Sequence, residues 1–123
     1  MRLGRKLTGG RYKRARKKKH YEKIGKVRIV KLGSTKKKEL RTRGGHKKVV
    51  LLSTNEANLI DKSKKSKKVK ITNVLETPSN RFLARQNILI KGAIIKTELG
   101  KARITNRPSQ EGCVQAELIE EEK

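Results

Sequence analysis

The most distinctive side chains of this sequence are those of lysine and arginine, which occur in runs. One run is Arg11-Tyr12-Lys13-Arg14-Ala15-Arg16-Lys17-Lys18-Lys19-His20-Tyr21, and a second is Arg41-Thr42-Arg43-Gly44-Gly45-His46-Lys47-Lys48. The planar guanidinium of arginine matches two phosphate oxygens, whereas lysine offers a point charge. Each contact with a phosphate releases condensed counterions, so such binding weakens steeply with salt. The runs therefore predict binding to a polyanion, with nucleic acid as the leading candidate.

Two glycine pairs, Gly9-Gly10 and Gly44-Gly45, stand among these cations. Glycine reaches positive φ and lets the backbone approach a ligand without a Cβ in the way. Each pair could turn the chain against a sugar-phosphate surface, with its amides directed at phosphate oxygens. The alternative is an ordinary turn before a strand, and a glycine pair that forms such a turn could also contact phosphate. No Gly-x4-Gly-Lys-Ser/Thr phosphate loop occurs.

Catalytic and metal chemistry find little support. His20 and His46 have no nearby Asp that would orient them as bases, and Cys113 has no assigned partner as a nucleophile. Glu120-Glu121-Glu122 are interpreted as part of an acidic tail, not as a ligand set. We expect no enzyme, no metal and no cofactor. A single cysteine also excludes an intramolecular disulfide and fits a reducing compartment, so the cytoplasm is the expected location.

Two of the three aromatic residues, Tyr12 and Tyr21, are interleaved with the cations. They could stack on unpaired bases or pack on the flank of the folded core. Three aromatics are too few for a sheet that reads single strands by stacking. The pattern favours recognition of folded RNA by shape and phosphate contacts.

The charge is concentrated at one end of the chain. The 123 residues carry a net charge of +24, and the first 48 hold 21 Lys and Arg against two acidic residues, for +19. Apolar residues divide the other way, with 12 in that part and 28 in the remaining 75. The first part cannot offset the entropy of ordering itself, so we expect it to be disordered in isolation. No apolar run is long enough to span a membrane.

The remaining sequence predicts short strands. Alternating or apolar segments at 26–32, 47–54, 68–75, 93–98, 101–105 and 113–119 are predicted strands, with a bulge or strand end at Ile29-Val30. We expect Val49–Leu52 to be buried on both faces, Val69 and Ile71 to share one face of their strand, and Cys113 to point outward. The residues expected to face inward on the last three strands are Ala93, Ile95, Ala102, Ile104, Val114, Ala116 and Leu118. Segment 61–68 is a predicted hairpin tip, 76–80 a turn, and 81–86 one helical turn carrying Phe82.

The predicted fold class is mostly β, a small antiparallel barrel-like core with an extended basic N-terminal arm. The predicted divisions are a basic extension at 1–25, the core at 26–119 with the basic Gly-Gly segment at 41–48, and the acidic tail at 120–123.

Four segments in this order resemble a known family. They are Lys6–Arg11 with its following basic run, Arg41–Gly45, Asn87–Ile95 and Thr97–Pro108. Together they resemble small-subunit ribosomal protein eight of the archaeal and eukaryotic type, over about residues 6–120, and the length resembles a short archaeal member. The resemblance implies a β-barrel-like core, a basic arm, binding to ribosomal RNA, and a structural role without catalysis.

The partners that follow are small-subunit ribosomal RNA and neighbouring ribosomal proteins, without a membrane, a small-molecule substrate or a homo-oligomer. A ribosome-assembly factor and a DNA-compacting chromatin protein remain alternatives. The charge pattern and the resemblance assign RNA contact to Arg5, Lys6, Thr8, Gly9, Gly10, Arg11, Tyr12, Lys13, Arg14, Arg16, Lys17, Lys18, Lys19, His20, Arg41, Arg43, Gly44, Gly45, His46, Lys47 and Lys48. Arg14 and Arg43 are the predicted bidentate phosphate contacts. Whether the Lys/Ser-rich tip at 61–68 touches RNA stays open.

Overall fold

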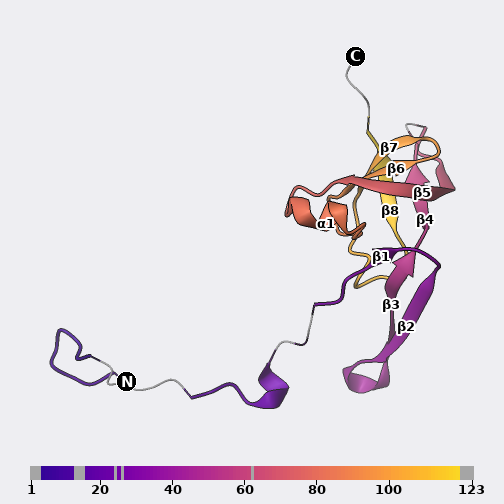
Figure 1. The fold of residues 1–123 in the computed structure, drawn as a ribbon. Coiled ribbons are helices and arrows are strands. Elements are labelled where there is room, and N and C mark those ends of the chain that lie inside the picture. Colours follow the sequence, from indigo (N-terminus) through magenta and orange to yellow (C-terminus); the bar gives the residue numbers. More distant parts are fainter. Residues whose placement is uncertain (1–3, 13–15, 24, 26, 62, 120–123) are drawn as a thin grey trace.

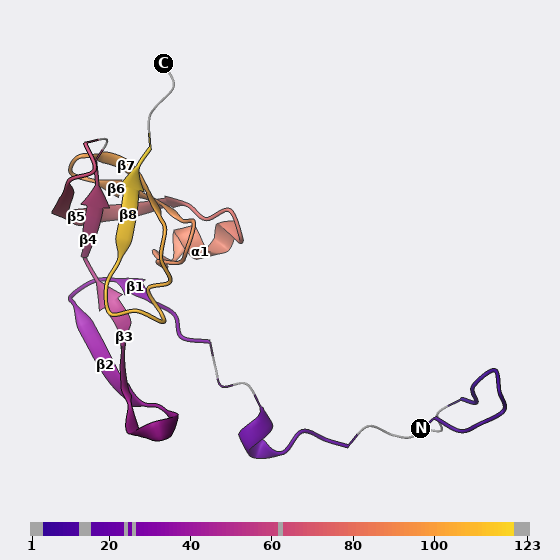
Figure 2. The ribbon, with the colours of Figure 1, turned by 180° about the vertical axis from the view of Figure 1, so that it is seen from behind.

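The computed structural model describes residues 4–12, 16–23, 25, 27–61 and 63–119, so Lys13, Arg14 and the acidic tail lie outside the described residues. Three parts follow one another in space (Figures 1 and 2). A barrel lies at one end, a two-stranded hairpin projects from it, and the N-terminal arm extends away to one side.

The barrel has five strands and is closed. The strands, in order around the barrel, are β4 (Glu56–Ile60), β5 (Ser66–Glu76), β6 (Ile94–Thr97), β7 (Gly100–Ile104) and β8 (Gln115–Leu118). Neighbours are antiparallel except for the closing pair, because β4 and β8 run parallel with Leu59 opposite Ala116. A ring with an odd number of alternating strands must contain one parallel pair. The barrel prediction is confirmed, and its purely antiparallel form is corrected at this pair.

Inward-facing residues alternate along the barrel strands, as strand periodicity requires. The core residues on these strands that are at most 6 % exposed are Ala57, Leu59, Val69, Ile71, Val74, Ile95, Ala102, Ile104 and Ala116. Of the predicted inward residues, Leu118 is only partly buried. A bulge between Ile71 and Asn73 shifts the phase of β5 and brings Val74 inward.

A second sheet of three strands carries the hairpin. It consists of β1 (Lys31–Leu32), β2 (Lys36–Arg41) and β3 (Lys47–Thr54) in the order β1-β3-β2. Only Asn55 separates β3 from β4, so the chain passes directly from this sheet into the barrel. The prediction of burial throughout Val49–Leu52 is only half right. Val50 and Leu51 are buried, whereas Val49 and Leu52 are about 40 % exposed.

The predicted strand at 26–32 is wrong over most of its length. Val27 is 85 % and Ile29 50 % exposed, and only Lys31–Leu32 is strand. Val30 is buried, and its carbonyl accepts a hydrogen bond from the amide of Leu89. Among the described residues, Val30 is the first whose backbone bonds to a residue of the folded core, so the chain joins the core there.

The connections agree with the turn predictions in most respects. The tip between β4 and β5 is shorter than predicted, because the Asp61 amide bonds to the Lys65 carbonyl and β5 begins at Ser66. Helix α1 (Arg81–Arg85) forms the predicted helical turn, and the Asn80 side chain caps it by accepting from the Phe82 amide at 3.0 Å. The last strand begins at Gln115, so Cys113 precedes it and is half-buried instead of lying outward on the strand.

Candidate nucleic-acid interface

The tip of the β2–β3 hairpin is a tight turn that needs its two glycines. The Thr42 amide and hydroxyl both donate to the His46 carbonyl, at 2.8 and 2.9 Å. Gly44 and Gly45 have φ of 80° and 81°, a region that is costly for a residue with a Cβ. A Cβ on Gly44 would also lie 3.4 Å from the His46 ring. The pair is therefore a turn between two strands, and it carries exposed cations on both sides.

Cations dominate the hairpin. Arg41 and Lys47 lie directly opposite each other on the two strands, an arrangement that costs free energy unless an anion lies nearby. The one acidic residue of β2, Glu39, forms an exposed ion pair with Lys47 at 3.4 Å. Lys36, Lys37 and Lys38 are exposed on the same strand and were absent from the sequence-based assignment. The lysine triplet ahead of Arg41 is the signal that could have found them.

The hairpin is tied to the barrel by the loop before β8. The Lys48 ammonium donates to the side-chain oxygen of Gln110 at 2.6 Å, and the Leu51 amide to the Pro108 carbonyl at 3.4 Å. The Arg28 guanidinium donates to the Ser109 carbonyl of the same loop. Lys48 is partly buried in this contact, so it positions the hairpin and offers less to a ligand than the exposed cations nearer the tip.

The first described part of the arm closes into a small loop. The Lys6 amide donates to the Gly10 carbonyl and the Gly9 amide to the Lys6 carbonyl, both at 2.9 Å, and Arg5 pairs with Arg11 as an isolated bridge. Gly9 has φ of 78°, so the turn needs glycine there. The loop brings Arg5, Lys6 and Arg11 together, all of them exposed.

A short 3₁₀ turn (His20–Glu22) organises the second part of the arm around one carboxylate. Arg16 donates to both oxygens of Glu22, at 2.9 and 2.6 Å, and the Lys19 amide donates at 3.0 Å. The guanidinium first, and then the amide, hold the pKa of Glu22 below its usual value. Arg16 is thus engaged within the arm, while Lys17, Lys18 and Lys19 are exposed.

Tyr12 and Tyr21 lie on the arm and not against the barrel. They are 53 % and 74 % exposed, and the ammonium groups of Lys6 and Lys19 lie 5.8 Å from their respective ring centroids. The alternative that each ring packs on the flank of the core is therefore wrong. Both rings are open to a ligand.

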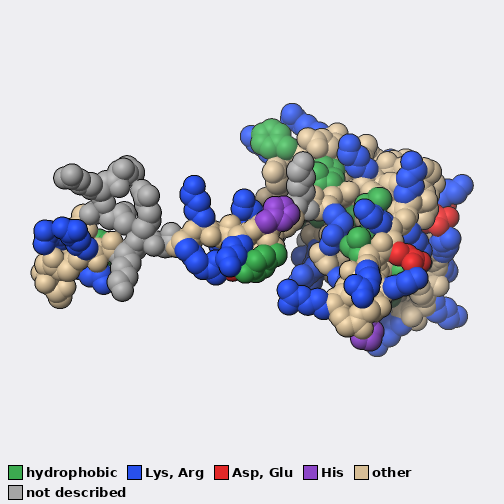
Figure 3. All heavy atoms as spheres, turned by 90° about the horizontal axis from the view of Figure 1, so that it is seen from below, with side chains coloured by type: hydrophobic (Ala, Val, Ile, Leu, Met, Phe, Trp, Pro, Cys, Tyr) green, Lys and Arg blue, Asp and Glu red, His purple; other side chains and the backbone are tan. Residues whose placement is uncertain are grey.

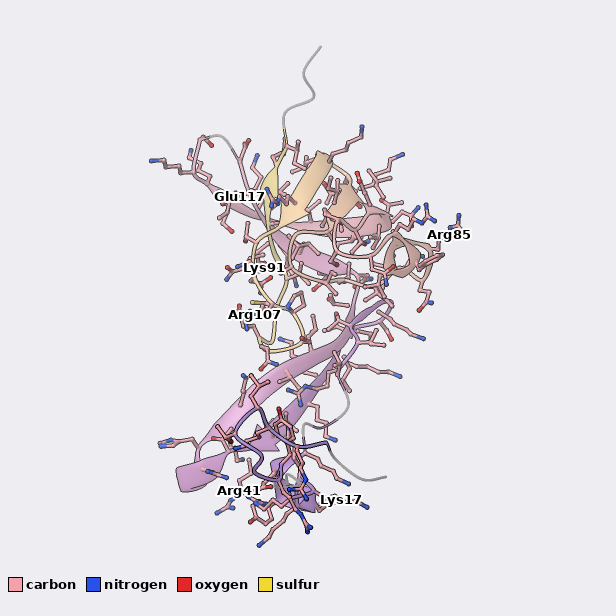
Figure 4. The ribbon with its side chains drawn as sticks, turned by 90° about the vertical axis from the view of Figure 1, so that its left-hand side faces the viewer. Lys17, Arg41, Arg85, Lys91, Arg107 and Glu117 are labelled. Atoms are coloured by element: carbon pink, nitrogen blue, oxygen red, sulfur yellow. The ribbon has the colours of Figure 1, made fainter. Side chains whose placement is uncertain are left out.

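The structure brings the assigned residues together in two projections. Figure 4 shows Lys17 of the arm and Arg41 of the hairpin both below the barrel, which carries Glu117 and Lys91, and Figures 1 and 2 show that the arm extends away from the hairpin to one side. Figure 3 shows Lys and Arg side chains spread over the arm and the visible face of the folded part, with few acidic side chains among them. Among the described residues, the hydrogen bonds and the ion pair of residues 4–12 and 16–23 all stay within the arm.

Other kinds of site are not formed by the described residues. Among them no three His, Cys, Asp or Glu side chains gather where they could hold a metal ion. His20 and His46 are exposed on separate projections, and Cys113 lies far along the chain in the loop before β8. None of the helices in the described ranges is long and apolar enough to cross a membrane.

The fold is therefore a small closed barrel that carries two projections with exposed cations. Comparison with known sequences narrows this class. Residues 1–119 match the family "Ribosomal protein S8e". The chain is 48 % identical over 120 residues to "Small ribosomal subunit protein eS8" of Methanococcus aeolicus, covering 95 % of this chain and 93 % of the relative.

Two further relatives carry the same name. The protein of Methanocella arvoryzae is 45 % identical over 94 % of this chain and 93 % of its own length, and that of Methanocorpusculum labreanum is 48 % identical over 94 % of each. The chain belongs to the ribosomal protein S8e family. It is therefore a ribosomal protein and not an enzyme, and the predicted resemblance is confirmed.

Proposed function

We propose that the chain is a structural constituent of the small ribosomal subunit in the cytoplasm, and that it binds folded ribosomal RNA through phosphate and shape contacts, supporting subunit assembly and translation. The relatives that are named small ribosomal subunit proteins match it over more than nine-tenths of its length, which supports transfer of the whole-protein role. Its partners are then small-subunit ribosomal RNA and neighbouring ribosomal proteins.

The observation that carries the proposal is the pair of basic projections. The arm and the hairpin both leave the barrel on the same side and expose cations that outnumber their acidic neighbours (Figure 1). Repulsion between such cations in the free protein is relieved when phosphates lie between them, and each contact releases counterions. We infer that the assigned residues of 5–20 and 41–48, together with Lys36–Lys38, contact RNA backbone.

The two projections have different mechanical roles in this proposal. The polar contacts of arm residues 4–12 and 16–23 with other described residues all lie within the arm, which supports an arm that follows a groove between RNA helices. The hairpin is fixed to the loop before β8 through Lys48 and Leu51 of β3, so it presents its cations at a set angle from the barrel. Residues 1–25 then act as the extension and 26–119 as the anchor.

The exposed tyrosines refine the recognition mode. Tyr12 and Tyr21 each lie beside a lysine, an arrangement that suits stacking on an unpaired base next to a phosphate. The two tyrosine rings would make local contacts with individual bases. The shape of the RNA and the positions of its phosphates would fix where the whole protein binds on it.

The test is sedimentation of the native protein in a lysate gradient at moderate and high salt, with and without ribonuclease. We expect stoichiometric migration with mature small subunits that resists moderate salt and is lost after ribonuclease. Migration only with precursor particles would replace the proposal by an assembly factor. Migration only with DNA would replace it by a chromatin protein.

A further inference from the structure

A second concentration of cations lies at helix α1, outside both projections. Arg81 and Arg85 are one helical turn apart and share a face of the helix, and both are exposed. Among the described residues neither guanidinium forms an ion pair. These two charges therefore belong to neither the arm nor the hairpin.

An exposed aromatic ring stands next to them. Phe82, the only phenylalanine of the chain, is 55 % exposed, and the Arg81 guanidinium lies 5.4 Å from its ring centroid. An apolar ring left in water beside a cation is a good platform for a nucleobase, because stacking buries its face and the arginine adds a cation–π contribution. The Asn80 cap fixes the start of the helix and so the backbone position of Phe82.

A hollow of about 430 Å³ lies beside the helix, with Asn73, Arg81, Arg85 and Asn87 in its lining. The side-chain oxygens of Asn73 and Asn87 both accept from the Val74 amide, at 2.9 and 3.3 Å. Their NH₂ groups are thus the part left for a ligand, and with the guanidiniums they make the lining rich in donors. Such a lining fits an acceptor-rich anion, and the volume is within the range of about 300–1,000 Å³ typical of small-ligand sites.

This site lies next to the point where the arm, which belongs to the proposed RNA interface, joins the barrel. Asn87 also accepts a backbone hydrogen bond from Leu32, and Val30 accepts one from Leu89, so the chain enters the core directly beside the segment that follows α1. Figures 1 and 2 both show α1 on the side of the barrel toward which the arm extends. RNA that follows the arm to the barrel reaches α1.

We propose that Arg81, Phe82, Arg85, Asn73 and Asn87, here called the α1 corner, hold one unpaired nucleotide of the RNA, with its base on Phe82 and its phosphate between the two arginines. The inference rests on the proposed function, since it names a further contact to the same RNA.

The first experiment uses the absence of tryptophan from the chain. Phe82→Trp in the full-length protein places a single fluorophore at the α1 corner, and Leu99→Trp places one at the turn between β6 and β7, where the side chain is 51 % exposed. With a transcript of its own small-subunit ribosomal RNA, we expect quenching of the first and little change in the second. Equal responses, or no response at position 82, would overturn the proposal.

The second experiment measures affinity for the same transcript at fixed salt. Phe82→Ala and Phe82→Leu are expected to weaken binding by about 5- to 150-fold, whereas Phe82→Trp keeps wild-type affinity because it keeps the stacking face. Arg85→Ala should make the salt slope shallower by about one, and Arg107→Ala, which lies on the opposite side of the molecule in Figure 4, should not. Circular dichroism checks that each variant is folded.

The outcomes separate this inference from the proposed function. Wild-type binding that is strong and salt-dependent, with all Phe82 variants unchanged, removes the α1 corner and leaves the proposed function intact. Failure of the wild type to bind the transcript removes both. A Phe82→Trp signal that is silent with RNA alone and changes only in reconstituted subunits would assign the α1 corner to a neighbouring protein, which also overturns the proposal.

Discussion

At the scale of single residues, Arg43 is the sharpest test of phosphate binding. It is exposed at the hairpin tip, and no ion pair among the described residues engages it. We expect Arg43→Ala to weaken binding to the ribosomal RNA transcript and to make the slope of log affinity against log salt shallower by about one, because one phosphate contact is lost. Arg103→Ala, at an exposed position of β7 opposite Glu117, is the matched control. An unchanged slope for Arg43→Ala would remove this residue from the site.

Glu22 is the residue whose ionisation organises the arm. Because the lowered pKa of Glu22 belongs to the folded turn, the ionised carboxylate stabilises the turn at neutral pH, and this contribution is lost as the pH falls through the lowered pKa. We expect the Lys19 amide resonance to follow this titration in NMR spectra. In the Glu22→Gln variant, the Lys19 amide resonance at pH 7 should resemble that of the wild type at acid pH. A Lys19 resonance that ignores both changes would contradict the contact.

At the scale of elements, the β2–β3 hairpin depends on its tip. Gly44→Ala puts a Cβ at φ of 80°, so we expect the tip to be destabilised by about 1–2 kcal/mol. Hydrogen exchange of the Thr42 amide, which bonds to the His46 carbonyl, measures this directly. Gly25→Ala, where a Cβ meets nothing within 4 Å, is the control. Unchanged protection of Thr42 would show that the turn tolerates a side chain.

The barrel depends on its buried face. Ile95 on β6 is fully buried, so Ile95→Ala is expected to lower the free energy of unfolding by about 2–5 kcal/mol through lost burial and a cavity. Leu99→Ala, at the exposed turn after the same strand, should change it by less than about 0.5 kcal/mol. Urea unfolding of the two variants makes the comparison, and similar losses would mean that the barrel core is assigned wrongly.

At the scale of the whole molecule, stability and RNA binding are carried by different parts. The described arm residues make no hydrogen bond or ion pair outside the arm, and most residues that build the core come after residue 48. We therefore expect deletion of residues 1–23 to leave the unfolding midpoint of the rest nearly unchanged. The same deletion should weaken RNA binding strongly and make its salt slope shallower by several units. A large fall in the midpoint would show that the arm packs on the core.

The sequence anticipated much of this arrangement. Alternation of apolar residues located β6, β7 and β8 and most of their inward faces, and the turn residues at 76–80 located the start of α1. It missed β4 (Glu56–Ile60), and it missed β2, because Lys36–Arg41 holds one apolar residue and is a strand only by pairing with β3. It also missed the α1 corner, since Asn73 and Asn87 are 14 positions apart along the chain and meet through the fold.

By itself the sequence determined the partition between a basic part and a core-forming part, the faces of the strands, and the family. These depend on residue type and short-range period, which the chain carries locally. The tertiary structure alone decided that β4 and β8 close the barrel in parallel, that Lys48 is held by Gln110, and that Arg16 is engaged by Glu22. Long-range strand pairing and the choice of one ionic partner among many depend on which groups the folded backbone brings within reach, and the local pattern does not encode that choice.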